Sequence, residues 1–290
     1  MFYVGTDLKY FWFQKYYGKD NAVGNAETNY ENGNINTINQ WYTDGDVIYI
    51  CSDGNFSTTD PVSYMAWDED SQTVKDVEGG CIGYFQVDST NYAAMDFDGV
   101  AIGSGAYAPG ETEPSGVFTC IVVDGTVEFT NRITVAGTAN VVLKDGAALT
   151  AGKGVEVNSG STLNIYAQSN GENMDKLIAN GPVAHAGIGS SDQNNSGGIY
   201  VHGGNITATS ASTGAGIGGG RYGSGTVTIY GGDITATGGS ADPGSGYNGH
   251  RVNGGGAGIG NGAYEVSGGT VTILGGNCVL LQEDLRQHMV

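Results

Sequence analysis

The sequence predicts an all-β fold, a right-handed parallel β-helix in which short strands stack as successive coils. Three observations predict it: internal repeats of strand-like segments, 52 glycines with only 5 prolines among 290 residues, and short alternating runs of Val, Ile and Thr in a chain that is 39% hydrophobic. This composition is typical of many short strands joined by tight turns. A chain of this length fits one large domain, or one domain with an N-terminal extension.

Internal repeats define the coils. Residues 199–209, 227–237 and 271–280 align with one another, and each contains a Gly-Gly step. The motif Ala-Gly-Ile-Gly precedes each of them, at residues 186–189, 215–218 and 257–260. The first step between repeats is 28 residues and the second is 44, so we expect an insertion of 16 residues between Gly238 and Gly256.

Alternation within each repeat predicts one shared core. Side chains of a strand point alternately to its two faces, and one coil cannot bury its apolar face alone. Stacking at roughly 4.8 Å per coil is therefore expected to place Val201, Ile229 and Ile273 in one hydrophobic column. The Gly-Gly steps allow sharp turns with positive φ. The residues after these steps should form a structural polar ladder: Asn205, Asp233 and Asn277.

Two regions are expected. Residues 1–100 contain all three tryptophans and show no coil repeat, which predicts an aromatic-rich N-terminal cap or irregular β region. Residues 101–290 should form the parallel β-helix. Leu281, Leu285 and Met289 have helical spacing, which predicts a short C-terminal cap over the open end of the coils.

Charge limits the choice of partner. Eleven basic residues face 30 acidic ones, giving a net charge of −19. Such a surface repels nucleic acid and anionic membranes, and a neutral or weakly charged partner is easier to accommodate. No apolar run approaches the roughly 20 residues of a membrane span. The start of the chain lacks a signal peptide, so a secreted protein would be represented by a mature form or an excised module.

Aromatic and polar residues at one corner of the coils form the first candidate site. The fifth residue after the Ile of each Ala-Gly-Ile-Gly motif is Gln193, Tyr222 and Tyr264. Equivalent positions should stack, which places the two tyrosines on one edge with Arg221 beside them. Tyrosine rings pack against the apolar face of a sugar, and polar groups take its hydroxyls. The insertion adds further candidates: Tyr247, Asn248, His250 and Arg251. The alternative is that these tyrosines only cover loop backbone.

A second candidate surface lies in the first hundred residues, where Trp41 and Trp67 are each surrounded by polar residues. Either indole could serve as a platform for a sugar ring.

Catalytic motifs are absent from the sequence. Glu128 and Glu156 occupy outward positions of strands and could share a face, but a glycosidase needs paired carboxylates flanking the bond. Asp96-Phe-Asp-Gly99 leaves calcium open without supplying a full calcium loop. The four cysteines lack the Cys-x-x-Cys spacing of a zinc site. We therefore expect no catalytic residue, no bound metal and no other cofactor, with a hydrolase or lyase as the alternative.

The repeats also resemble a known group of proteins. Ala-Gly-Ile-Gly followed by Thr-Val-Thr-Ile-x-Gly-Gly-x-Ile-Thr-Ala is similar to the β-helical carbohydrate-binding modules of polysaccharide-degrading, xylanase-type enzymes from gut bacteria. The resemblance covers about residues 120–280. It implies a secreted or cell-surface bacterial module that binds a plant cell-wall polysaccharide such as xylan, next to other domains of a larger enzyme. A surface adhesin or structural spacer is a further alternative.

Overall fold

The chain is represented by a computed structural model that describes residues 10–11, 42–43, 49–50, 56–57, 62–81, 84–96, 98–107, 118–169, 175–240, 254–264 and 268–282. It divides into two compact units, residues 1–61 and residues 62–290. The first unit contains two short antiparallel pairs: β1 (Tyr10–Phe11) with β2 (Tyr42–Thr43), and β3 (Tyr49–Ile50) with β4 (Phe56–Ser57).

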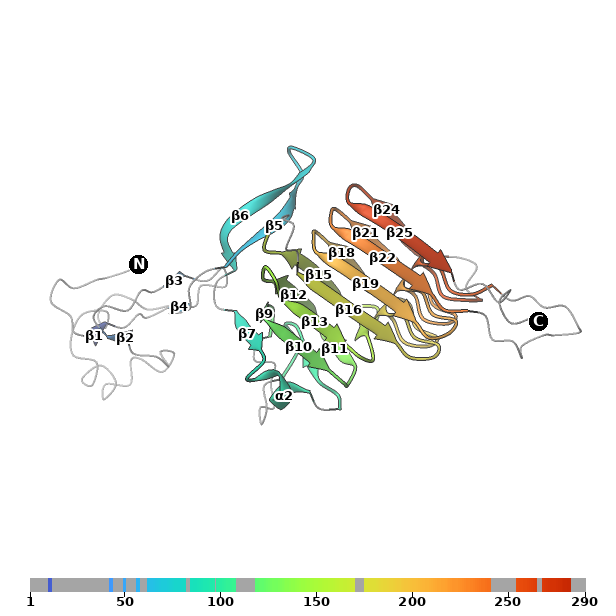
Figure 1. Cartoon of the computed structure of the whole chain (residues 1–290), viewed down its shortest axis with the longest axis horizontal. Helices are drawn as coiled ribbons and strands as arrows, with labels where there is room; N and C mark the ends of the chain where they lie inside the picture. Colours follow the sequence, from blue (N-terminus) through green and yellow to red (C-terminus); the bar gives the residue numbers. More distant parts are fainter. Residues whose placement is uncertain are drawn as a thin grey trace, which may run out of the picture. The chain divides into compact units, whose positions relative to one another are not determined.

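The second unit contains a parallel β-helix built from three sheets (Figure 1). Sheet I consists of β10 (Thr126–Phe129), β13 (Ala148–Ala151), β16 (Lys176–Gly181), β19 (Asn205–Ser210), β22 (Asp233–Gly238) and β25 (Asn277–Gln282). Sheet II consists of β8 (Ala101–Ile102), β11 (Ile133–Val135), β14 (Val155–Glu156), β17 (Ile188–Gly189), β20 (Ile217–Gly218) and β23 (Ile259–Gly260). Sheet III consists of β7 (Phe85–Asp88), β9 (Cys120–Asp124), β12 (Thr138–Leu143), β15 (Thr162–Ala167), β18 (Gly198–Val201), β21 (Thr226–Ile229) and β24 (Thr270–Ile273).

The predicted columns are present. Val201 pairs with Ile229, and Ile229 pairs with Ile273, all in parallel register within sheet III. Val201 and Ile229 are fully buried. Because every coil contributes the same inward positions, the apolar faces merge into one continuous core, as the alternation of the sequence requires. The parallel β-helix prediction is confirmed, and its right-handed sense stays a prediction.

The polar ladder at the corner is also confirmed. Asp233 pairs with Asn205 on one side and with Asn277 on the other. The Asn277 amide donates to the Asp233 carboxylate over 2.7 Å. Gly232, in the turn before Asp233, has φ of +98°, a conformation that a side chain disfavours. The Gly-Gly steps therefore work as the sequence indicates.

The insertion of 16 residues divides between two loops. Paired residues are offset by 28 positions at Thr209 and Thr237, by 42 at Ile217 and Ile259, and by 44 at Thr226 and Thr270. Fourteen of the extra residues therefore precede β23, and two follow it. Placing all 16 before Gly256 was wrong because the strand repeat alone does not reveal where β23 pairs.

The N-terminal end of the solenoid is closed by its own chain. β7 already pairs with β9 in parallel, and the short helix α2 (Tyr92–Met95) lies beside β10. The Tyr92 ring meets the Phe129 ring edge-on, with centroids 6.3 Å apart. Asp96 then accepts hydrogen bonds from the backbone N–H groups of Thr130 and Asn131, each over 2.9 Å. These contacts hold α2 against the first coils.

A hairpin covers the outer flank of sheet III. It is formed by β5 (Val62–Asp68) and β6 (Thr73–Cys81), which pair antiparallel. Val62 is buried against Val122 and Val142, which point outward from sheet III. Cys120, beside them on β9, is disulfide-bonded. The predicted strand at residues 61–67 thus exists, but it belongs to this hairpin and not to a coil.

The last described coil consists of β23, β24 and β25. Leu281 lies in β25, so the helical spacing expected from Leu281 onward does not hold for that residue. Leu285 and Met289 lie outside the described residues. Within the described part of the chain, no helix has the length and apolar character needed to cross a membrane.

Candidate functional site

The corner loops after β17, β20 and β23 carry the predicted residues in one conformation. Gln193, Tyr222 and Tyr264 all have positive φ, of 61°, 60° and 70°. Few residues other than glycine or asparagine adopt this conformation without cost. The backbone is fixed between coils, since the Tyr222 N–H donates to the Ala263 carbonyl over 2.9 Å. The loops are therefore equivalent positions of successive coils, as expected from the motif.

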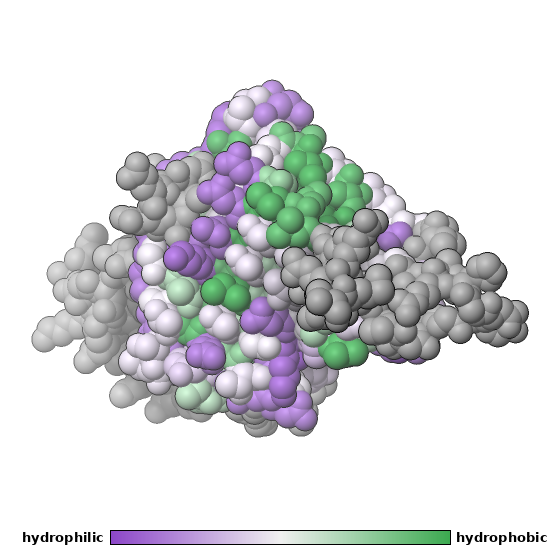
Figure 2. Space-filling model, turned by 45° about the vertical axis from the view of Figure 1, so that its right-hand side comes forward, coloured by the Kyte–Doolittle hydropathy of each residue, from purple (hydrophilic) through white to green (hydrophobic). Residues whose placement is uncertain are grey.

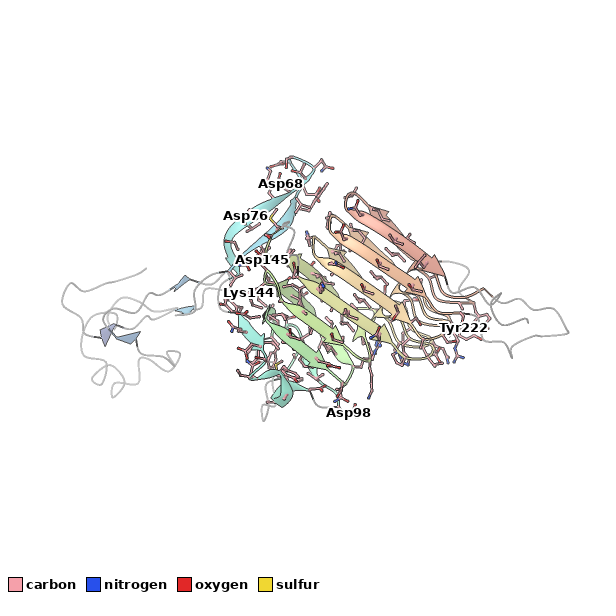
Figure 3. The ribbon with its side chains drawn as sticks, in the orientation of Figure 1. Asp68, Asp76, Asp98, Lys144, Asp145 and Tyr222 are labelled. Carbon is pink, nitrogen blue, oxygen red and sulfur yellow. The ribbon has the colours of Figure 1, made fainter. Side chains whose placement is uncertain are left out.

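The two tyrosines stack on each other. Their ring centroids lie 5.1 Å apart with an interplanar angle of 27°. Tyr222 is 49% exposed and lies at the corner of the coils (Figure 3). The Arg221 guanidinium carbon is 5.5 Å from the centroid of the Tyr222 ring. Because the two rings share a face, the pair presents edges and phenol hydroxyls to solvent in addition to any remaining ring surface.

Arg221 is held in place by the preceding coil. Its Nε donates to Asp192 over 3.0 Å and its Nη2 donates to the other carboxylate oxygen over 2.6 Å. The hydrogen bond with Arg221 lowers the pKa of Asp192, and the same bond raises the pKa of Arg221. Both groups are therefore charged at neutral pH. A two-pronged pair of this kind fixes the guanidinium plane better than a single contact does.

Polar groups flank the stacked rings. Gln193, Asn194 and Asn195 of the preceding coil are exposed. The Asn195 side-chain oxygen accepts from the Ser224 N–H over 2.9 Å, and the Asn194 amide donates to Ser191 over 2.9 Å. These bonds order the corner while the Gln193 side chain stays in solvent. We call Asp192, Gln193, Arg221, Tyr222 and Tyr264 the corner surface.

Several predicted residues lie outside the described part of the chain. These are Trp41, Tyr247, Asn248, His250 and Arg251. Their contribution to a site stays a prediction.

Trp67, the remaining candidate, belongs to a second aromatic cluster. Its ring stacks on Tyr230 at 5.2 Å, and its backbone N–H donates to His202 Nδ1 over 3.0 Å. The His202 ring is stacked between Tyr166 at 4.5 Å and Tyr230 at 4.6 Å. The Trp67 Nε1 is buried and has no hydrogen-bond partner. In this arrangement Trp67 attaches the β5–β6 hairpin to sheet III, and one face of its indole is already occupied.

Sequence reasoning missed this cluster, although a signal was present. Tyr166, His202 and Tyr230 each follow the last inward residue of a sheet III strand, so the repeats place them in one outward column. Burial lowers the pKa of His202 to about 4, so its Nδ1 is an unprotonated acceptor at neutral pH. Burial also raises the pKa of Tyr166 to about 12. The repeat pattern shows the column but not the hairpin that covers it.

The carboxylates considered for catalysis lie on different sheets. Glu128 belongs to β10 of sheet I and Glu156 belongs to β14 of sheet II. Glu156 is paired with Arg132, whose Nε lies 3.2 Å from its carboxylate, and it also accepts from Asn158. Arg132 further donates to the Lys153 carbonyl over 2.7 Å. The expectation that these two carboxylates share a face was wrong, because the chain turns between β10 and β14.

Calcium ligands were sought around Asp96. Both Asp96 oxygens accept hydrogen bonds from Thr130 and Asn131. Among the described residues, no group of three or more His, Cys, Asp or Glu side chains is arranged to hold a metal ion.

Comparison with known proteins leaves the fold as the only class that can be stated. No protein-family model, curated protein or solved structure matches the chain. Three parallel sheets whose strands step in register define a parallel β-helix solenoid.

Proposed function

We propose that the solenoid is a non-catalytic carbohydrate-binding module that recognises a plant cell-wall polysaccharide at the corner surface. The observation that carries the proposal is the stacked, half-exposed Tyr222 ring beside an Arg221 fixed by Asp192. Sugars are recognised by aromatic carbons against their apolar face and by planar hydrogen-bonding groups at their hydroxyls. The corner surface offers both kinds of group side by side.

Backbone conformation supports a role for the tyrosine side chains. A turn that needs only positive φ is made most cheaply by glycine. Here Tyr222 and Tyr264 adopt that conformation, at a cost on the order of 1 kcal/mol each. Residues held in unfavourable conformations concentrate at functional sites. The retained side chains are therefore better explained by a ligand than by the turn.

The solenoid geometry supports a polymer as the ligand. Equivalent corner positions recur once per coil, roughly every 4.8 Å along the axis. A chain of repeating sugars running along the axis meets Gln193, Tyr222 and Tyr264 in turn. The net charge of −19 favours a neutral or weakly acidic polymer.

Xylan is the first polymer to test, since the repeats resemble the β-helical modules of xylanase-type enzymes from gut bacteria. A secreted or cell-surface location agrees with the disulfide at Cys120, because disulfides persist in oxidising compartments. On this proposal, the module positions further domains of a larger secreted enzyme on their substrate.

Affinity gel electrophoresis in xylan, β-glucan and mannan tests the proposal. We expect retardation in at least one polymer and its loss in Tyr222→Ala and Arg221→Ala. The matched control is Tyr107→Ala, because Tyr107 is 51% exposed but lies after β8 in the first coils. Equal loss in both tyrosine variants would remove the corner surface from the proposal.

The same polymers also test the non-catalytic part. Release of reducing ends or of unsaturated products by the purified chain would contradict it and favour a β-helical hydrolase or lyase. An adhesin or spacer is favoured if the chain neither binds nor cleaves any of these polymers.

A further inference from the structure

The last coil exposes most of the solenoid's exposed hydrophobic side chains. Nine large hydrophobic residues are exposed in the described part of the chain, and six of them lie in this coil. They are Val271, Ile273, Leu274, Val279, Leu280 and Leu281, with exposed fractions of 42 to 52%. Figure 2, which turns the C-terminal end of the solenoid forward, shows a continuous hydrophobic patch on this side of the molecule. Patches of this kind mark interaction sites.

The exposed residues continue the core columns. Val271 and Ile273 pair with Val227 and Ile229, which are 1% and 0% exposed. Leu280 pairs with Ala236, which is fully buried. The end of the solenoid thus presents the same interface through which each earlier coil binds the next one.

β25 is apolar on its outer face as well. Its outward residues Val279 and Leu281 pair with Thr235 and Thr237 of the preceding coil. Strands that are apolar on both faces are typical of strands buried inside a sheet with a neighbour on each side. β25 has the composition of an internal strand, yet no described strand pairs with its outer edge.

Charge also distinguishes this end. Residues 268–282 contain no charged side chain, in a chain whose net charge is −19. Two copies of such a chain repel each other over most of their surface, within the roughly 8 to 10 Å reach of charges in physiological salt. The last coil is the surface that two copies can bring together with the least repulsion.

From these observations we infer that the C-terminal end of the solenoid is a self-association surface, on which β25 pairs with β25 of a second copy about a twofold axis. The N-terminal end cannot serve as the other half of a head-to-tail contact, because β7, α2 and their neighbours already cover it; Val87 and Met95 there are 2% and 7% exposed. One open end per chain gives a closed dimer and no filament.

The strand itself is self-complementary in this arrangement. A twofold axis requires antiparallel pairing, and an axis at Leu280 places Leu280 opposite Leu280 of the second copy. Val279 then lies opposite Leu281 of the second copy on the outer face, and both lose water contact. Opposed residues in antiparallel strands interact most strongly when both are apolar. The pairing also satisfies the open edge of β25.

Sedimentation velocity on the full chain, from micromolar to near-millimolar concentration, tests the inference. We expect a monomer–dimer equilibrium without larger species, strengthened by salt because salt screens the net charge. Leu280→Lys places two cations opposite each other and should weaken dimerisation by at least about 100-fold. The matched control Val183→Lys, at a residue 65% exposed in the loop before β17, should leave it unchanged.

Cross-linking tests the register. In a Cys278→Ser background, Leu280→Cys should form a disulfide-linked dimer under mild oxidation, because opposed residues have Cα atoms about 4.5 to 5.5 Å apart, within disulfide reach. Thr228→Cys, one coil further in, should not. Far-UV circular dichroism of each variant checks that the solenoid is intact.

Three results would overturn the inference. A monomer at every concentration is one, and a dimer that persists in Leu280→Lys is another. The third is a monomeric full chain that dimerises only after deletion of residues 283–290, which would identify that segment as the cover of the last coil. None of these results depends on polysaccharide binding.

Discussion

The two ends of the solenoid carry the same kind of apolar column but treat it differently. At the N-terminal end, Val87 and Phe118 are 2% and 5% exposed because β7, α2 and the Asp96 contacts close the coils. At the C-terminal end, Val271 and Ile273 are 42% and 45% exposed. The difference shows that an inward-facing position is not a buried one by itself. Burial in a solenoid requires a following element, whether coil, cap or partner.

The outer flank repeats this lesson. The outward column of sheet III runs through Tyr166, His202 and Tyr230 to Leu274. The β5–β6 hairpin meets the first three through Tyr64 and Trp67, whereas Leu274 is 48% exposed. Closed coils and the open coil therefore differ on the outside as well as at the end.

The largest expected effect tests whether the closed coils are dry. Asp175 is fully buried without a hydrogen-bond partner, and burial raises the pKa of its carboxyl to about 7. In the unfolded chain the pKa is near 3.8. Between these values the folded state holds a proton that the unfolded state has lost, so the free energy of unfolding falls as pH rises from about 4 to about 7. The loss is about 4 kcal/mol at pH 7 and above.

Asp175→Asn should remove this dependence and be the more stable protein above pH 7. Urea unfolding of both proteins from pH 4 to pH 8 measures it. Parallel pH profiles for the two proteins would mean that water reaches Asp175 and that the closed coils are not dry.

The second effect compares the two parts of one column. Ile229→Ala, in a closed coil, should cost about 3 kcal/mol because it leaves a cavity. Ile273→Ala, in the open coil, should cost less than about 1 kcal/mol at low protein concentration, since the side chain is 45% exposed. Chemical unfolding of both variants checks this, and equal costs would show that the last coil is covered.

The third effect concerns the hairpin. Burial lowers the pKa of His202 to about 4, whereas an unfolded histidine titrates near 6.5. The unfolded state therefore binds a proton first, and stability falls as pH drops from about 6.5 to about 4, by up to about 3 kcal/mol. Protonation also removes the acceptor of the Trp67 N–H.

His202→Asn keeps an acceptor oxygen but cannot titrate, so its unfolding free energy should change less between pH 7 and pH 4 than that of the parent chain. His202→Phe, which lacks any acceptor, serves as the control and should be destabilised at both pH values. A parent chain and His202→Asn with the same acid sensitivity would refute the assignment.

The smallest effect separates binding from turn formation at the corner surface. Tyr222→Gly relieves positive φ and should leave stability unchanged or raise it by up to about 1 kcal/mol, while polysaccharide retardation is lost. Tyr222→Asn, which also tolerates this conformation, is the control that keeps a polar side chain. Thermal unfolding and affinity electrophoresis of each variant provide the two readings. A glycine variant that unfolds more easily would give Tyr222 a structural role.

Much of the fold could be predicted because it repeats. Strand alternation fixed the column of Val201, Ile229 and Ile273, and the Ala-Gly-Ile-Gly motif located the corner tyrosines, since both depend on contacts between equivalent positions of neighbouring coils. The ladder of Asn205, Asp233 and Asn277 follows from the same register. Periodicity along the chain becomes proximity in space when coils stack.

The tertiary structure decided what does not repeat. Trp67 and His202 are 135 residues apart, and Glu156 meets Arg132 across two sheets of one coil. Asp175 occupies a corner position where the next coil has Gly204, and only packing shows that its carboxyl finds no donor. The sequence by itself determined the coils because each coil specifies its neighbour. The closure of one end, the hairpin on the flank and the exposure of the last coil were decided by single contacts between distant segments, which leave no period in the sequence.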